Sequence, residues 1–191
     1  MAWAEGASAL ATARISGSSR SRNIVDYLEQ LLRQWYEYQG YFVRSDLWVG
    51  LQSDGTYDCE LDIVAFHPVR RHVVHIEPSY ELLSSKDTEQ HFQTKFDAGK
   101  KYLHRLFGLE DHLHIEQYAL IVGRQGVHGH TIGGGRIVLL SDFLSDILQR
   151  LSGFGIANSM VPEQWPLILT LQLVTEYRQQ LAPLLGGLPG A

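Results

Sequence analysis

The chain contains a single cysteine, Cys59, among its 191 residues. One cysteine excludes an intramolecular disulfide framework and a zinc cluster built on thiolates. We therefore expect a reducing, cytoplasmic location. Alternation along the strand-like segment around it predicts that Cys59 is a small buried side chain on the face opposite Glu60 and Asp62.

Long apolar runs and an excess of positive charge are also missing. No segment reaches the roughly 18 apolar residues of a membrane span, and the N-terminus lacks the basic and apolar regions of a secretory signal. Lysine and arginine total 16 against 21 aspartates and glutamates, which gives a net charge of −5. This balance argues against a protein that coats nucleic acid through charge alone, but it permits a local basic groove.

The apolar pattern predicts an α/β fold in which helices flank a mixed central sheet. Residues 1–21 are interpreted as a flexible arm, residues 22–152 as the α/β core, and residues 153–191 as a helical appendage with a loose tail. Apolar spacing typical of helices recurs at about 23–38, 85–107, 142–151 and 166–181. Runs typical of strands lie at about 41–51, 57–66, 72–77, 118–122 and 136–140.

Carboxylates lie on the two strand-like runs at 57–66 and 72–77, which are joined by one short turn. If these strands pair as an antiparallel hairpin centred on the turn, Asp62 faces Glu77. In the same register Glu60 faces Ser79, and alternation places His75 on that face as well. Opposed residues have Cβ atoms about 4.5–5.5 Å apart, and like charges at that distance repel. The hairpin therefore predicts a site for a divalent cation, with solvated acids that bind nothing as the alternative.

The order helix, three-strand meander, helix, strand is the core order of the restriction-endonuclease-like fold. The signature of that superfamily, the PD-(D/E)XK motif, places an Asp on the second strand and Glu-x-Lys on the third. This chain resembles the superfamily over about residues 22–140, with Asp62 matching the Asp and Glu77 the Glu. The resemblance implies that both carboxylates bind Mg²⁺ or Mn²⁺ together with the carbonyl of Pro78. Glu29, on the first helix, resembles an acid that many members place near the metal.

Ser79 departs from the motif, because it stands where the superfamily has lysine. A serine carries no charge and cannot replace an ammonium group in stabilising an anion. Some members carry this lysine on the following helix instead, and Lys95 is placed to reach the site from there; Lys86, Lys100 and Lys101 are further candidates on that helix. The other outcome is a degenerate site in a fold that persists as a binding module.

The resemblance implies a metal-dependent nuclease that hydrolyses phosphodiester bonds, with DNA as the expected substrate. Three residues are expected to support the metal site, namely Glu60, Ser79 and His75. Four basic residues are candidates for contacts with the nucleic-acid backbone, namely Arg70, Arg71, Lys100 and Lys101. An apolar C-terminal helix could serve a homodimer, as many such nucleases dimerise.

Two other readings remain open from the sequence. A catalytically inactive relative would bind nucleic acid or a protein partner without cleaving it. A plain interaction scaffold would carry solvated acids and bind no nucleic acid.

Two further features are interpreted as structural. The pairs at 112/114 and 128/130 are surface histidines without a nearby acid, and Gly133–Gly135 is a hairpin tip because no strand leads through it into a helix.

Overall fold

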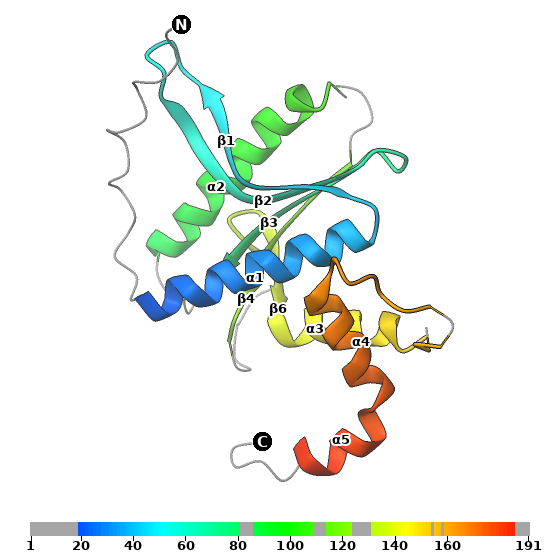
Figure 1. The fold of residues 1–191 in the computed structure, drawn as a ribbon. Helices are drawn as coiled ribbons and strands as arrows, with labels where there is room; N and C mark the ends of the chain where they lie inside the picture. The colour runs from blue at the N-terminus through cyan, green and yellow to red at the C-terminus, as the bar shows by residue number, and fades with distance from the viewer. Residues whose placement is uncertain are drawn as a thin grey trace, which may run out of the picture.

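A six-stranded mixed sheet organises the computed structural model, which describes residues 19–80, 86–108, 114–123, 131–153, 155–157 and 159–185 (Figure 1). Across the sheet the strand order is β1-β2-β3-β4-β6-β5. The strands are β1 (Phe42–Leu51), β2 (Tyr57–His67), β3 (His72–Ser79), β4 (His114–Ile121), β5 (Thr131–Ile132) and β6 (Gly135–Leu139). The helices are α1 (Ser19–Tyr38), α2 (Lys86–Leu106), α3 (Leu140–Leu151), α4 (Pro166–Glu176) and α5 (Arg178–Leu185).

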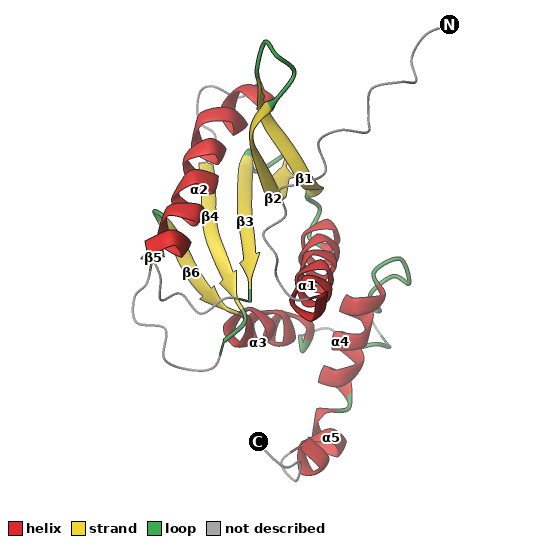
Figure 2. Cartoon of the chain, turned by 90° about the vertical axis from the view of Figure 1, so that its left-hand side faces the viewer, coloured by secondary structure: helices red, strands yellow, loops and turns green. Residues whose placement is uncertain are grey.

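The predicted class, an α/β fold with helices around a mixed sheet, is confirmed. Strands β1, β2 and β3 form an antiparallel meander, whereas β3, β4 and β6 run parallel. Helix α2 covers one face of the sheet, α1 and α3 lie on the other, and α4 packs on α1 and α3 (Figure 2). No helix in the described part of the chain is both long and apolar enough to cross a membrane. Of the predicted arm, residues 1–18 lie outside the described residues, whereas 19–21 begin α1 and are not part of an arm. The tail from 186 and His112, His128 and His130 also lie outside the described residues.

The two long helices bury the stripes that the sequence predicts. In α1 the stripe is Leu28, Leu31, Leu32 and Trp35, and in α2 it includes Phe92, Phe96 and Leu103. The chain leaves α1 through Gly40, whose φ of 87° suits glycine. Its N–H donates to the carbonyl of Glu37, and the next N–H, of Tyr41, donates to that of Tyr36. This C-terminal cap sets the direction in which β1 enters the sheet.

The register of the β2–β3 hairpin is the one that the sequence predicts. Ile63 lies opposite Ile76, and the ladder continues in that register to His67 and His72 beside the turn. On the other side of Ile63 the ladder ends, because the N–H of Asp62 donates to a side-chain oxygen of Glu77 instead of to the neighbouring backbone. The two carboxyl-bearing residues therefore lie directly beyond the last rung of the hairpin.

Side-chain alternation, by contrast, breaks along β2. Cys59 lies on the face opposite Glu60, as predicted, but the prediction that it also lies opposite Asp62 is wrong. Positive φ angles occur on the paired strand β1, at Asp46 (51°) and Gly50 (73°). On β2, Cys59 and Leu61 pack toward α2, although Ile63 packs toward α1. Cys59 therefore lies on the side of the sheet that Lys95 approaches. Glu60, between Cys59 and Leu61, lies on the opposite face and not on the face of Glu77.

Pro78 ends the pairing of β3 on one side only. The strand continues to Ser79 beside β4, where Pro78 pairs with Leu120 and Ser79 with Ile121. On the β2 side the ladder has already ended at Ile76, so the missing N–H of Pro78 breaks no rung there. β3 thus lies at a local edge beyond Ile76, where a strand can accommodate proline.

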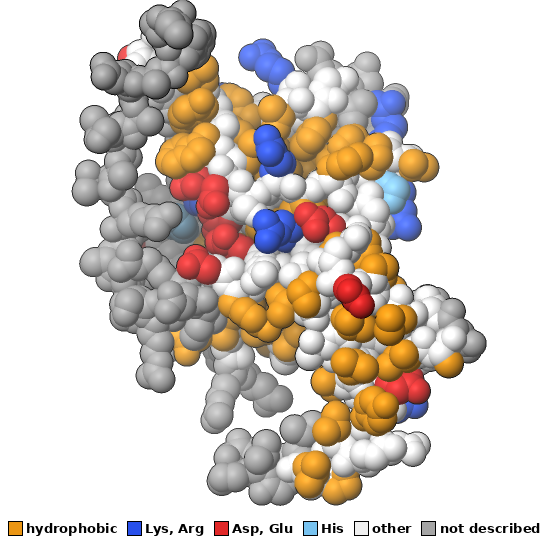
Figure 3. All heavy atoms as spheres, in the orientation of Figure 1, with side chains coloured by type: hydrophobic (Ala, Val, Ile, Leu, Met, Phe, Trp, Pro, Cys, Tyr) orange, Lys and Arg blue, Asp and Glu red, His pale blue; other side chains and the backbone are white. Residues whose placement is uncertain are grey.

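The C-terminal helical segment differs in length from the helix that the sequence predicts. One helix was expected over 166–181, but α4 ends at Glu176 and α5 begins at Arg178. The buried side of α4 carries Ile168, Gln172 and Thr175, while Leu173 is 41% exposed. Gln172 is buried because its amide binds the preceding loop: it accepts the N–H of residue 161 and donates to the carbonyl of residue 159. The exposed apolar side chains follow α4 and α5 along one edge of the molecule (Figure 3).

Candidate active site

Lys95 lies between Asp62 and Glu77, where α2 packs on β2 and β3. Its Nζ is 2.6 Å from Oδ1 of Asp62 and 3.1 Å from Oε2 of Glu77. The side chains of Lys95, Asp62 and Glu77 are 12%, 24% and 2% exposed. Phe92 and Phe96 fix this arrangement, because they anchor α2 on the sheet and leave Lys95 at the rim of the buried stripe. The sequence allows the lysine of the motif to be carried on the helix after β3, and Lys95 occupies a position of that kind.

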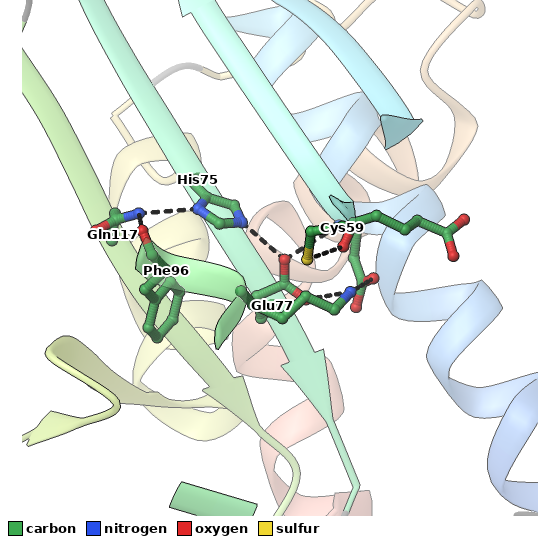
Figure 4. A network of polar contacts seen from close by, with 8 residues as sticks. Cys59, His75, Glu77, Phe96 and Gln117 are labelled. Atoms are coloured by element: carbon green, nitrogen blue, oxygen red, sulfur yellow. Dashed lines mark hydrogen bonds and ion pairs between the residues drawn. The ribbon is translucent and has the colours of Figure 1, made fainter. Parts of the chain in front are cut away.

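The two oxygens of Glu77 have different surroundings. Oε1 accepts the backbone N–H of Asp62 at 3.1 Å and lies 2.7 Å from Nε2 of His75 (Figure 4). Oε2 is buried and accepts no hydrogen bond from the described residues. Its nearest charged neighbour is Nζ of Lys95, which forms an ion pair with it without hydrogen-bond geometry. Glu77 therefore presents one oxygen that is fixed by hydrogen bonds and one whose charged partner among the described residues is the ammonium group of Lys95.

Lys95, Asp62 and Glu77 form a cluster, called here the Lys95 cluster, in which negative charge exceeds positive charge when both carboxyl groups are ionised. Burial raises the pKa of Asp62 to about 8, and the charge of Glu77 adds to that rise. Burial would raise the pKa of Glu77 as well, but the hydrogen bond to His75 and the charge of Lys95 lower it to about 2. Burial alone would lower the pKa of Lys95, yet the two carboxylates raise it above its usual range. One ammonium group thus faces two buried carboxyl groups, so Asp62 favours either a proton or a second cation.

Glu29 on α1 adds a third acid to this region. Burial raises its pKa to about 7, and the nearby charges of Asp46, Asp26 and Glu77 add to the rise, in that order. The charge of Lys95 acts in the opposite direction. Acidic side chains gather on the surface between the β1–β2 hairpin and α1 (Figure 3). The structure therefore brings the helix acid predicted from the sequence within electrostatic range of the Lys95 cluster.

Asp46 belongs to this acidic region and was not predicted from the sequence. It lies in β1 between Ser45 and Leu47, which pair with residues 63 and 61, so its neighbour across the ladder is Asp62. Its φ of 51° is a conformation that aspartate adopts more readily than most residues. An aspartate in the middle of a strand-like segment was the available signal, because aspartate is depleted in regular strands.

Two other sequence-predicted residues of β3 flank the cluster without entering it. Pro78 directly follows Glu77 along the chain. The side chain of Ser79 is half-buried, and its carbonyl accepts the N–H of Val122 at 3.0 Å. Gln117 on β4, which sequence reasoning missed, contacts His75 beside the cluster. No local pattern marks Gln117, because only the β3–β4 register brings it next to His75.

The four basic residues predicted to contact nucleic acid lie on two elements, the β2–β3 turn and α2. Arg70 and Arg71 lie in the β2–β3 turn, beyond the end of β2 at His67. Five residues separate Asp62 from that end, or about 17 Å at the usual rise per residue of a strand. The turn is therefore at the far end of the hairpin from Lys95.

Lys100 and Lys101 lie on α2, closer to Lys95 but in two different environments. Nζ of Lys100 is 3.7 Å from Oδ1 of Asp97 on the same helix. Nζ of Lys101 is 3.2 Å from Oδ2 of Asp58, at the start of β2. Both lysine side chains are more than half exposed, so these ion pairs contribute little to stability.

The donor set of the cluster suits a hard divalent cation. Carboxylate oxygens from Asp62 and Glu77, with the carbonyl of Pro78 nearby in the chain, are the type of ligand that Mg²⁺ and Mn²⁺ bind. The buried Oε2 of Glu77, which accepts no hydrogen bond, fits such an ion. Among the described residues no three acidic, histidine or cysteine side chains already converge in metal-binding geometry. Lys95 instead occupies the space between the two carboxylates, and a bound ion would have to share it.

The raised pKa values predict that the cation-free protein loses stability as the pH rises. Asp62 and Glu29 hold a proton more tightly in the folded than in the unfolded chain. Stability should therefore fall between about pH 5 and about pH 8, because the folded state binds more protons over that interval. The lowered pKa of Glu77 acts only below about pH 4.5. Burial lowers the pKa of His72, which opposes the trend below about pH 6.5, but this is one group against two. Thermal unfolding measured across this pH range tests the prediction. Each kcal/mol of lost stability should lower the thermal midpoint by about 2–4 °C.

Asp62→Asn provides the control for this pH dependence. The amide cannot ionise, so the fall in the thermal midpoint between about pH 5 and about pH 8 should be much shallower in this variant. Mg²⁺ should raise the midpoint of the wild-type protein more at the higher pH, where it no longer competes with a proton. An equal slope in wild type and Asp62→Asn would show that Asp62 does not carry the effect.

Comparison with known proteins identifies no relative of this chain. No protein-family model matches it, and no curated protein or solved structure shows significant similarity to it. The geometry and chemistry of the Lys95 cluster are therefore the observations that bear on function.

Proposed function

We propose that this protein is a metal-dependent nuclease of the restriction-endonuclease-like superfamily, which hydrolyses phosphodiester bonds in DNA. The observation that carries the proposal is the meeting of Lys95 from α2 with Asp62 and Glu77 directly beyond the last rung of the β2–β3 hairpin. The order of α1, β1, β2, β3, α2 and β4 supports it, because it matches the core order of that superfamily. Lysine on the helix would supply the charge that Ser79 lacks.

The residues of the cluster divide the chemistry among them. Asp62, Glu77 and the carbonyl of Pro78 would hold Mg²⁺ or Mn²⁺, which when bound polarises a phosphate oxygen and lowers the pKa of a coordinated water. Lys95 would place its ammonium group against the negative charge that develops on the phosphate. Glu29, with a pKa near 7, is suited to accept a proton from the attacking water.

A catalytically silent relative, which binds nucleic acid or a protein partner, is the second candidate. The specific observation in its favour is that Nζ of Lys95 already contacts both carboxylates, as in a purely structural ion pair. The scattered positions of Arg70, Arg71, Lys100 and Lys101 also fit a protein without a single basic groove. In this alternative the ammonium group, and not a metal, is the resident cation.

Cleavage of labelled DNA separates the two candidates. The nuclease should cut single- or double-stranded DNA in the presence of Mg²⁺ or Mn²⁺ and stop when a chelator is added. Asp62→Asn and Glu77→Gln should each reduce the rate at least about a hundredfold, because a metal ion contributes several kcal/mol of transition-state stabilisation. Calorimetric titration with Mn²⁺ should show weaker binding to both variants.

Glu60→Gln is the matched control for these variants. Glu60 is two residues from Asp62 on the same strand, but it lies on the other face of the sheet, since Cys59 and Leu61 both pack toward α2. Its replacement should change cleavage less than about threefold, the effect expected of a residue outside the cluster. DNA binding without cleavage in the wild-type protein, under every cation tried, would favour the silent relative. Neither binding nor cleavage would favour a plain scaffold.

A further inference from the structure

His75 connects the candidate active site to the interior of the sheet. It lies on β3 two residues before Glu77, and its side chain is fully buried. Nε2 of His75 is 2.7 Å from Oε1 of Glu77, and Nδ1 is 3.0 Å from Nε2 of Gln117 (Figure 4). Gln117 is the direct neighbour of His75 in the parallel β3–β4 ladder. Both ring nitrogens therefore have protein partners.

The carbonyl of Phe96 determines which nitrogen of His75 carries the proton. Nε2 of Gln117 lies 2.8 Å from this carbonyl oxygen, which can only accept a hydrogen bond. The amide group of Gln117 must therefore point its nitrogen, not its oxygen, into this space. Its second N–H then donates to Nδ1 of His75, so Nδ1 is an acceptor and the proton of the neutral ring is on Nε2. From Nε2 it is donated to Oε1 of Glu77.

Helix α2 closes this network against solvent and substrate. Gly99 lies directly over it, and a Cβ atom there would overlap the ring of His75 and lie 2.7 Å from Nε2 of Gln117. The ring of Phe96 meets the edge of the imidazole at a centroid distance of 5.4 Å. His75 therefore cannot touch a nucleic acid or an attacking water, and it can act only through Glu77.

We propose that His75 and Gln117 are positioning residues, which hold Oε1 of Glu77 so that Oε2 points to Lys95 and the proposed cation site. Gln117 fixes the tautomer of His75, and His75 fixes the carboxylate. The part of this inference that concerns the cation rests on the proposed function, whereas the tautomer and the orientation of Glu77 do not. Carboxylates and imidazoles that orient a metal ligand in this way typically change metal affinity by about 10–100-fold when they are removed.

The tautomer is measured first, on the cation-free protein with ¹⁵N-labelled histidine. In the wild-type protein, NMR should show the ring of His75 protonated at Nε2 and unprotonated at Nδ1. The ionised carboxylate of Glu77 also favours a proton on Nε2, so the role of Gln117 is tested in Glu77→Gln, whose amide can pair with either tautomer. The ring should stay protonated at Nε2 in Glu77→Gln and become a mixture of tautomers in Glu77→Gln/Gln117→Met, where Gln117→Met keeps the length of the side chain but removes both N–H donors. A single Nε2–H tautomer that persists in the double variant would overturn the role of Gln117. Thermal unfolding shows whether the variant is folded.

Mn²⁺ affinity measured by calorimetry then tests the role of His75. His75→Leu should weaken binding by about 10–100-fold. His75→Gln offers an amide N–H near the position of Nε2 and should restore most of the affinity. A purely structural role would give similar affinities for both variants once folded, and this result would overturn the positioning role. If the wild-type protein binds no Mn²⁺, the proposed function fails, while the tautomer experiment still decides whether Gln117 orients His75.

Discussion

Lys95→Met is expected to reduce metal-dependent cleavage of DNA by about 10²–10³-fold while Mn²⁺ binds more tightly than to the wild-type protein. The two effects have opposite signs because the ammonium group has two roles. It would stabilise the developing charge on the phosphate, but it also occupies the space between Asp62 and Glu77 at 2.6 and 3.1 Å. Methionine keeps much of the volume of the side chain and removes its charge, so repulsion of the metal ion disappears along with the catalytic charge.

The variant also leaves two buried carboxyl groups without their ammonium partner. Loss of one member of a buried ion pair typically costs about 3–5 kcal/mol, although Asp62 can reduce this cost by taking up a proton. Cleavage should therefore be measured with Mn²⁺ present, after thermal unfolding has shown that the variant is folded. Single-turnover cleavage and calorimetric titration together separate the rate from the affinity.

Lys100→Met is the matched control on the same helix. Lys100 is 53% exposed and pairs only with Asp97 at 3.7 Å among the described residues, so its removal should leave the thermal midpoint and the Mn²⁺ affinity nearly unchanged. Undiminished cleavage by Lys95→Met would contradict the role proposed for Lys95. Weaker Mn²⁺ binding in this variant would show that the ammonium group does not compete with the metal.

Gly133→Ala is expected to destabilise the fold by about 2–5 kcal/mol, the largest effect on stability that we predict for a single methyl group. Gly133 forms the turn between β5 and β6 with a φ of 55°, which disfavours side chains. A Cβ atom there would also overlap the backbone of Phe92 and Gln93 in α2. The added Cβ would be fixed to the backbone of the turn and would meet backbone atoms of α2, so no flexible side chain could move away to relieve the overlap. Urea unfolding monitored by circular dichroism measures the change.

Gly134→Ala controls for the backbone conformation alone. Its φ of 80° is also disfavoured for alanine, but the nearest atom to its Cβ is the flexible end of Lys100 at 3.4 Å. We expect a loss of about 1–2 kcal/mol from conformation only. Equal losses in the two variants would show that the contact with α2 is unimportant. Since the N–H of Gly133 also donates to Glu89 at 2.8 Å, the turn helps to place α2 and hence Lys95.

Local pattern was sufficient to predict the β2–β3 hairpin and its register. Strand-like runs on either side of one short turn leave little freedom, and the observed pairing of Ile63 with Ile76 is the predicted one. The side-chain faces were less predictable. Leu61 and Ile63 are two residues apart on β2 but face opposite sides of the sheet, so Cys59 lies toward Lys95 and Glu60 on the other face. A break of this kind depends on the backbone of the paired strands, and no periodic pattern in the sequence marks it.

The sequence by itself determined the α/β class, the paired acids of β2 and β3, and the amphipathic helix that follows them, because these depend on contacts between near neighbours in the chain. Only the tertiary structure decided that Lys95, and not Lys86 or Lys101, meets Asp62, since the angle at which α2 packs on the sheet selects one lysine from one helix face. It also decided the role of Gln117, which lies 42 residues from His75 in the chain but beside it in the β3–β4 ladder. Pairings of this range arise from the folding of the whole sheet, and no short segment contains them.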